Sequence, residues 1–377
     1  MMKPETTAIH VPEKIYDGAI APPIQLSTTF EHGPANELIH GFQYVRHANP
    51  NVNDLEARLT ALEGGIGAVA FSSGIAAGIA LLNTLPHGST IVFHDTIYFD
   101  FLTFGRSRLS NWGLRAKIID CRDAGALRTA LADGKGEAAM LVWLESPANP
   151  TLDLIDIEAV SKIAAEYGAK TLVDGTFATP VLQRPFNLGA DYVLHSTTKY
   201  MGGHSDVQGG ALIVRDDEAT VDALITTRKL TGGALAPFNA WLTSRGLQTL
   251  HCRMEKHCSN ALAIATMLET HPAVARVRYP YLAKSEDFLL AGKQMTAGGG
   301  MVSFDVKGGR DAAIEVAAAL SLIVNATSLG GTESLIEHRA SIEGPESTTP
   351  DNLLRLSVGL EHAEDLIADL GQALDSC

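Results

Sequence analysis

Asn149, Asp174 and Lys199 are three polar residues that each come shortly after a short apolar segment of the chain. Those segments are residues 140–144, 170–173 and 191–194. The carboxyl ends of parallel strands lie at one edge of an open α/β sheet, and such folds bind their ligands there. If the segments are strands, the three side chains meet at one site.

The chemistry of Lys199 and Asp174 suggests which ligand that site takes. A lysine removed from water has a lowered pKa and becomes a nucleophile toward aldehydes. An aspartate can keep a pyridine nitrogen protonated. Pyridoxal phosphate needs both groups, Lys for the covalent link to its aldehyde and Asp for its ring nitrogen. The pair therefore predicts a pyridoxal-phosphate site.

A phosphate-binding segment is predicted at residues 71–78 (FSSGIAAG), where a strand end, a glycine turn and a helix N-terminus follow one another. Backbone N–H groups at such a helix start bind anions. Ser196 and Thr198 add hydroxyl groups beside Lys199. Tyr98 follows the next apolar segment, and its ring could stack on the pyridine.

Apolar segments of four to six residues alternate with helical stretches in the first two thirds of the chain. The expected strands are residues 68–71, 90–94, 116–119, 140–144, 170–173, 191–194 and 211–214. Residues 156–167 have the spacing of an amphipathic helix, and Asn53 with Glu56 predicts a helix over 54–63. This alternation is typical of a parallel α/β sheet.

The pattern changes after about residue 246. One long helix is expected over 247–271, then strands at 301–306 and 353–358 with helices near 311–320 and 364–374. The sequence therefore predicts an N-terminal arm (1–50), a large cofactor-binding domain (51–246) and a smaller C-terminal α/β domain (247–377).

Composition excludes several classes of partner. The 377 residues contain 43 acidic and 29 basic side chains, a formal net charge of −14. Nucleic acids and anionic membranes attract clustered Lys and Arg, so neither is an expected partner. Four cysteines are too few for a disulfide scaffold. With no apolar run long enough to span a membrane and no signal peptide at the N-terminus, a cytoplasmic protein with a small-molecule ligand is expected.

Three other motifs predict little. Residues 65–70 (GIGAVA) match a dinucleotide-binding fingerprint, but they follow a helix and open a strand, the reverse of the required context. Residues 196–199 (STTK) match S-x-x-K of penicillin-binding serine hydrolases without their other motifs. His251 and Cys258 would lie about 10 Å apart along a helix, too far for one zinc ion, so no metal is expected.

Longer motifs carry a family resemblance over nearly the whole chain. They are residues 18–24 (GAIAPPI), 27–30 (STTF), 44–50 (YVRHANP), 173–180 (VDGTFATP), 196–206 (STTKYMGGHSD), 328–331 (SLGG) and 354–359 (LRLSVG). They resemble the Cys/Met-metabolism family of pyridoxal-phosphate enzymes, which includes cystathionine γ-synthase, the cystathionine lyases, methionine γ-lyase and the homoserine sulfhydrylases. The resemblance implies an α/β protein of fold type I, with a mostly parallel seven-stranded sheet in the large domain and a smaller C-terminal α/β domain.

The resemblance also implies roles for the matching residues. Lys199 would hold the cofactor and move protons, Asp174 would pair with the ring nitrogen, and Tyr98 would stack on the ring. The remaining cofactor contacts would come from Gly74, Ile75, Thr176, Ser196 and Thr198, and from Tyr44 and Arg46, which would reach the phosphate of a neighbouring subunit. The substrate carboxylate would bind Arg355, helped by Asn149 and Ser328. An active dimer follows, within a homotetramer.

Departures from the family pattern bear on the substrate. Gly175 replaces the Asn of the usual V-D-N, Thr103 stands where several relatives carry Arg, and Thr327 stands where many γ-specific relatives carry Glu. The missing Glu favours β-elimination of cystathionine or a related sulfur amino acid. The alternatives are a γ-synthase, γ-lyase or O-acylhomoserine sulfhydrylase and, in a different class, a cofactor-binding protein without turnover. Arg106 and Asp100 are the charged residues expected nearest the distal end of the substrate.

Overall fold

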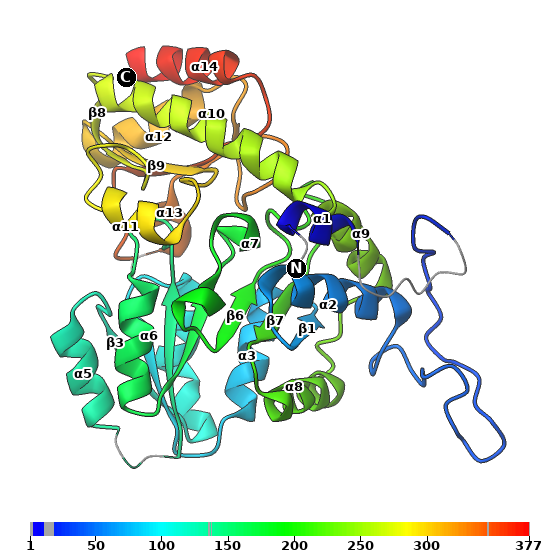
Figure 1. Ribbon diagram of the computed structural model, residues 1–377. Coiled ribbons are helices and arrows are strands. Elements are labelled where there is room, and N and C mark those ends of the chain that lie inside the picture. Colours follow the sequence, from blue (N-terminus) through cyan, green and yellow to red (C-terminus); the bar gives the residue numbers. More distant parts are fainter. Residues whose placement is uncertain (1–2, 11–18, 135, 137, 345–346, 377) are drawn as a thin grey trace.

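The structure is a computed structural model, and it describes residues 3–10, 19–134, 136, 138–344 and 347–376 (Figure 1). Gly18, the first residue of one family motif, and Cys377 lie outside the described residues. Two sheets organise the chain. The larger lies in the lower half of Figure 1, and the smaller lies above it beneath the long helix α10 (Leu250–Thr270).

Among the described residues, seven strands form the large sheet in the order β1-β7-β6-β5-β4-β2-β3. Only β7 runs antiparallel to its neighbours β1 and β6, which confirms the predicted mostly parallel sheet. The strands are β1 (Gly67–Phe71), β2 (Thr90–His94), β3 (Arg115–Ile119), β4 (Met140–Glu145), β5 (Lys170–Asp174), β6 (Tyr192–His195) and β7 (Gly210–Val214).

Helices cover both faces of the large sheet because its strands are apolar on both sides. Along β1, Val69 and Phe71 pack into the core with α3 (Gly74–Thr84), whereas Ala68 and Ala70 pack with α2 (Pro50–Glu63) on the opposite face. The other elements around this sheet are α4 (Phe99–Ser107), η1 (Leu109–Trp112), α5 (Ala124–Ala132), α6 (Ile157–Glu166), α7 (Thr179–Leu182), η2 (Pro185–Leu188) and α8 (Glu218–Thr231).

The small sheet has the strand order β10-β11-β12-β9-β8 among the described residues. Its strands are β8 (Val274–Arg278), β9 (Met301–Val306), β10 (Val324–Asn325), β11 (Leu335–Glu337) and β12 (Leu353–Ser357). Its apolar core packs against α10, α12 (Gly309–Ala319) and α14 (Ala363–Asp375). The helices α11 (Phe288–Gln294) and α13 (Arg339–Glu343) complete the described helices of this part, whereas α9 (Pro237–Leu247) packs on α2 beside the large sheet.

Two predicted helices are present but begin at other residues than expected. The helix expected to begin after Asn53 begins at Pro50, because Asn49 is the N-cap and its side chain accepts a hydrogen bond from the Asn51 N–H at 2.9 Å. The long helix expected over 247–271 is α10, which begins at Leu250 because Leu247 still belongs to α9 and residues 248–249 form a turn.

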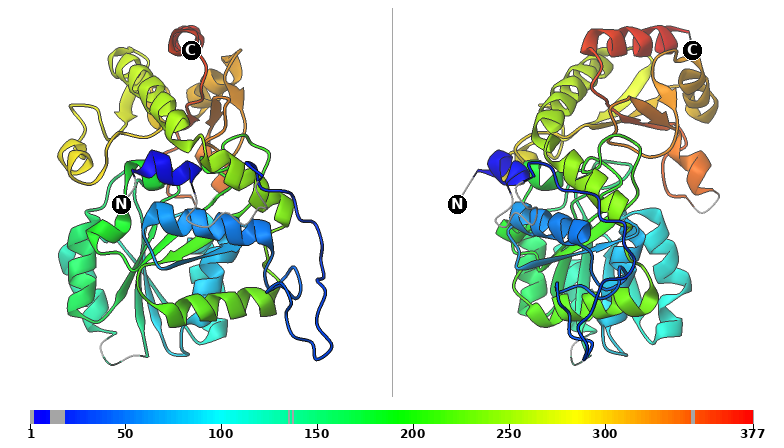
Figure 2. Two further views of the ribbon diagram at one scale, coloured as in Figure 1. Left: turned by 45° about the vertical axis from the view of Figure 1, so that its right-hand side comes forward. Right: turned by 90° about the vertical axis from the view of Figure 1, so that its right-hand side faces the viewer.

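The N-terminal arm is more structured than expected at its start and extended after it. Helix α1 (Pro4–Ile9) packs on α2, where Arg58 donates a hydrogen bond to the Ala8 carbonyl at 3.2 Å. Figure 2 shows the following described segment, in dark blue, running along one side of the molecule. It contacts α9 through the Trp241 Nε1–H, which donates to the Pro22 carbonyl at 2.8 Å. The structure describes no helix both long and apolar enough to cross a bilayer.

Candidate active site

Lys199 lies in the turn after β6, where the part of the chain that holds the large sheet faces the C-terminal part. Its Nζ donates a hydrogen bond to the Ser328 Oγ of the C-terminal part at 3.0 Å. Burial, with the positive charge of Arg355 as a second cause, lowers the lysine pKa from 10.5 to about 8. With this pKa roughly a tenth of the amine is neutral at pH 7 and about half at pH 8, and the neutral form can attack an aldehyde.

Asp174 and Glu145 are two buried carboxyl groups paired across the neighbouring strands β5 and β4. Asp174 accepts a hydrogen bond from the Thr176 N–H at 2.9 Å. Burial raises the pKa of Asp174, and burial together with the nearby Asp174 raises the pKa of Glu145 well above its usual value. A cationic ring nitrogen fits this place, because it would compensate the buried negative charge.

The start of α3 forms the predicted anion-binding segment. Ser73 caps the helix, with its Oγ accepting from the Ala76 N–H at 3.1 Å, and Gly74 begins it. A Cβ at position 74 would lie 3.0 Å from the Cβ of Ser196, so glycine keeps the space between the two open. The Ser196 N–H donates to the Thr176 hydroxyl at 2.9 Å, which fixes the facing turn. The backbone N–H groups at the start of α3, which face this turn, fit a phosphate group.

Arg355 on β12 supplies the wall opposite the large sheet. Its Nη1 donates to the Asn149 Oδ1 at 2.9 Å, and its Nη2 donates to the Ser328 carbonyl at 3.1 Å and to Glu337. Burial lowers the Arg355 pKa to about 10, so the guanidinium stays charged at neutral pH. Ser328 has φ +79°, a left-handed backbone that is uncommon for serine. This arrangement can bind a carboxylate.

A cavity of about 420 Å³ brings these groups together. Tyr98 lines the cavity at the start of α4. Burial raises the pKa of its phenol to about 12. The backbone N–H of Tyr98 donates a hydrogen bond to the Glu145 carboxylate at 2.6 Å. The predicted site residues in the lining are Gly74, Ile75, Tyr98, Asn149, Asp174, Thr176, Ser196, Thr198, Lys199, Ser328 and Arg355. Because the cavity offers an amine, an anion cradle and a place for a cationic ring, these residues fit pyridoxal phosphate.

Tyr44 and Arg46 are predicted site residues that do not line this cavity. They lie exposed on the arm, with the Arg46 guanidinium 5.3 Å from the centre of the Tyr44 ring. Arg46 Nη1 donates to the Lys229 carbonyl, at the end of α8, at 2.8 Å. Within one chain they are outside the site, so a cofactor contact from either residue has to be made in a neighbouring copy.

Nine lining residues were not predicted as site residues, among them Glu145, Phe177, Gln208 and Arg339. Glu145 could have been predicted from the sequence, because it follows an apolar segment directly, as Asp174 does. No sequence pattern indicated Arg339, since it lies between two motifs and belongs to neither. Thr103, Arg106 and Asp100, the residues expected near the distal end of the substrate, are not in the lining.

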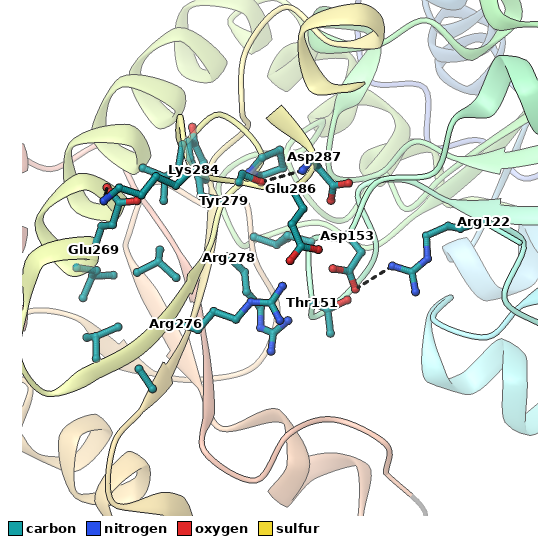
Figure 3. A pocket seen from close by; sticks show the side chains of 18 residues that line it. Arg122, Thr151, Asp153, Glu269, Arg276, Arg278, Tyr279, Lys284, Glu286 and Asp287 are labelled. Carbon is teal, nitrogen blue, oxygen red and sulfur yellow. Dashed lines mark hydrogen bonds and ion pairs between the residues drawn. The ribbon is translucent and has the colours of Figure 1, made fainter. Parts of the chain in front are cut away.

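A second cavity, of about 370 Å³, lies between β8 and the loop after β4 (Figure 3). Two pairs of its charged side chains interact with each other, Arg122 with Asp153 at 3.9 Å and Lys284 with Glu269 at 3.5 Å. None of the predicted site residues lines it. The chemistry therefore belongs to the first cavity.

Comparison with known proteins agrees with this site. A family model described as Cys/Met metabolism PLP-dependent enzyme matches residues 5–375. The cystathionine gamma-synthase of Mycobacterium tuberculosis (strain ATCC 25618 / H37Rv) is 42% identical over 380 residues, which cover 98% of this chain and 96% of the relative. The L-methionine gamma-lyase of Porphyromonas gingivalis (strain ATCC BAA-308 / W83) is 41% identical over 379 residues, with 95% and 93% covered.

A solved structure extends the match to three dimensions. The crystal structure of cystathionine gamma synthase from Xanthomonas oryzae pv. oryzae, in complex with aminoacrylate and cysteine, is 38% identical, covers 100% of this chain and 98% of that chain, and has a TM-score of 0.93. The predicted fold class, the pyridoxal-phosphate cofactor and the enzymatic nature of the protein are confirmed by these matches. The chain belongs to the Cys/Met metabolism family of PLP-dependent enzymes.

Proposed function

We propose that this enzyme breaks a bond at the γ-carbon of an amino acid, by γ-replacement with a thiol or by γ-elimination. The observation that carries the proposal is the match, across 95–98% of the chain, to relatives named for γ chemistry. The substrate class is then an O-acylated homoserine or a γ-thioether amino acid.

The side chains of the cavity have separate tasks in this proposal. Pyridoxal phosphate, when bound, supplies an electron sink for negative charge at the substrate Cα. Arg355 and Asn149 bind the substrate α-carboxylate and orient its Cα–H bond. Lys199 Nζ, held by the Ser328 hydroxyl 3.0 Å away, takes the proton from Cα. Asp174 holds a proton on the ring nitrogen by its negative charge.

The β-elimination of cystathionine is the second candidate. Thr327 lines the cavity at the position where many γ-specific relatives carry Glu. An uncharged residue there favours a reaction that needs no further acid or base beyond the Cα. Both reactions use the same cofactor site and differ in which carbon loses its substituent.

Product analysis separates the two candidates. The purified enzyme is incubated with cystathionine, methionine, O-acetylhomoserine and O-succinylhomoserine, each with and without cysteine. We expect cystathionine from an acylhomoserine with cysteine, and 2-oxobutanoate without it. Pyruvate from cystathionine, with no product from the γ-substituted compounds, would establish β-elimination and refute the γ proposal.

We further propose that the active unit is a dimer within a homotetramer. The proposal is supported by Tyr44 and Arg46, which match a family motif for reaching a neighbour's phosphate but lie outside the cavity of their own chain. The arm also exposes apolar side chains, among them Ile20 at 89% and Leu26 at 65%. A second copy would cover them. We place the enzyme in the cytoplasm on its low cysteine content.

A further inference from the structure

We infer that Arg339 determines substrate specificity by binding a carboxylate at the distal end of the γ-substituent. The inference rests on the proposed function and goes further, because it names the chemistry of the leaving group. It also assigns the distal charge to Arg339 in place of Arg106 and Asp100, which the sequence predicted there and which do not line the cavity.

Arg339 and Arg355 lie side by side in the cavity wall. Arg339 begins α13, directly after β11, and Arg355 is on the adjacent strand β12. Both guanidinium groups donate to the same carboxylate oxygen of Glu337, Arg339 through its Nη1 at 3.3 Å. The two arginines line the cavity, whereas Glu337 does not. Glu337 therefore lies behind them and sets their spacing.

A second carboxylate holds Arg339 from the other side. The Nε and Nη2 of Arg339 donate to the Glu343 Oε1 at 3.2 and 2.9 Å. The other oxygen of Glu343 accepts from the hydroxyls of Ser347 and Thr349 at 2.6 and 2.7 Å. Glu343 does not line the cavity either. The guanidinium is thus fixed in position by groups outside the space that a substrate occupies.

The fixed guanidinium keeps donors for a ligand. Arginine has five N–H groups, and the contacts to Glu337 and Glu343 use one each on Nε, Nη1 and Nη2. In the described part of the chain this leaves one N–H on each Nη atom. Two such donors match the two oxygens of a carboxylate. Although burial lowers the Arg339 pKa, Glu337 and Glu343 raise it above the usual value, so the charge is permanent.

The position of α13 assigns Arg339 to the distal end of the substrate. Ile342, one turn further along this helix, also lines the cavity and is 57% exposed, so the helix lies at the cavity mouth. Of the two residues that define the reacting end, Asp174 is buried and Lys199 is half-buried. A substrate whose α-carboxylate binds Arg355 therefore extends its γ-substituent past Arg339. A succinyl ester ends there in a carboxylate, whereas an acetyl ester ends in a methyl group.

The test compares two esters on two enzymes. With cysteine as the common thiol, kcat/KM is measured for O-succinylhomoserine and O-acetylhomoserine on the wild type and on Arg339→Gln/Glu343→Gln, which removes one charge of each sign. We expect the double variant to lose at least tenfold, about 1.4 kcal/mol, for the succinyl ester through KM, and less than twofold for the acetyl ester. Arg106→Gln, an exposed arginine on α4 outside the lining, is the matched control and should change neither value.

Equal losses for the two esters, or a wild type without preference, would overturn the inference. Arg339→Lys, which keeps the charge but not the planar pair of donors, serves if the double variant does not fold, and should lose several-fold for the succinyl ester alone. An inert pair of ligands, 2-aminononanedioate and 2-aminononanoate, tests binding without turnover. The dicarboxylate should bind the wild-type holoenzyme at least tenfold tighter, and this difference should vanish on substitution of Arg339. If neither ester reacts, the γ proposal fails while this binding comparison still decides the role of Arg339.

Discussion

Lys199 illustrates how burial turns an ordinary side chain into a reactive one. A lysine in water has a pKa near 10.5, and burial together with Arg355 lowers it to about 8 here. Below that pH the amine is protonated and cannot attack an aldehyde, whereas above it the amine is free. The reactivity of Lys199 toward the cofactor aldehyde therefore changes within a pH range that is easily measured.

We predict that the rate at which pyridoxal phosphate attaches to the cofactor-free protein rises with pH, with a midpoint near pH 8. Absorbance during mixing follows the rate, and borohydride reduction with peptide mapping locates the modified lysine at position 199. Lys199→Ala should abolish attachment, and Lys162→Ala, an exposed lysine on α6 paired with Glu158, should not. A midpoint near 10.5, or a label on another lysine, would contradict the assignment.

Helix α3 connects the anion-binding turn to the core, and its packing requires a glycine. Gly78 lies one turn from the start of the helix, and a Cβ there would lie 2.6 Å from the Phe101 ring and 2.7 Å from the Trp143 ring. Both rings are buried, so neither can turn out into solvent to make room. Gly371 on α14 is also inside a helix, but a Cβ there would have no neighbour within 4 Å.

The same substitution should therefore have opposite effects on the two helices. Gly78→Ala should lower the free energy of unfolding by about 1–3 kcal/mol, because it overpacks the core. Gly371→Ala should raise it by about 0.4–1 kcal/mol, because alanine loses less conformational freedom on folding. Urea denaturation of the holoenzyme measures both. A stabilised Gly78→Ala protein would show that the aromatic rings can move aside.

At this scale, sequence patterns predicted the elements that are governed by local chemistry. The apolar segments became strands within a residue or two, and the residues that follow them, Asp174 among them, came together in the cavity. The start of the long helix α10 was predicted three residues too early, because Leu247 belongs to the preceding helix α9 and residues 248–249 form a turn. Arg339 could not be predicted, since its place depends on Glu337 and Glu343, contacts formed only once the chain folds.

The whole molecule shows a site assembled from distant parts of one chain and an arm that does not contribute to it. The arm is anchored near its end, where buried Arg228 of α8 donates to the His47 carbonyl at 3.2 Å and to Glu56 of α2. Tyr44 and Arg46 precede this anchor by only a few residues. Their positions are thus fixed relative to the body of the chain, as sharing a site between copies requires.

Mixed oligomers test this sharing. Arg46→Ala chains, which retain Lys199, are combined with Lys199→Ala chains, which retain Arg46, by unfolding and refolding them together. Within a mixed dimer one of the two sites receives both native residues, so a mixed dimer should have about half of the wild-type activity, and a random mixture of dimers about a quarter. Arg106→Ala combined with Lys199→Ala gives the reference in which Arg46 is intact in both chains. Activity no greater than in either parent would refute a shared site.

Arg355, Glu337, Arg339 and Glu343 form a buried row of alternating charges, and this row constrains how the enzyme can evolve. Removing one member of a buried ion pair leaves its partner unpaired and costs about 3–5 kcal/mol, a large part of the stability of a typical domain. A change of leaving group by mutation of Arg339 alone would therefore be selected against before it could improve catalysis. The accessible mutational path replaces Arg339 and Glu343 together, so epistasis between these two side chains limits how substrate preference can change.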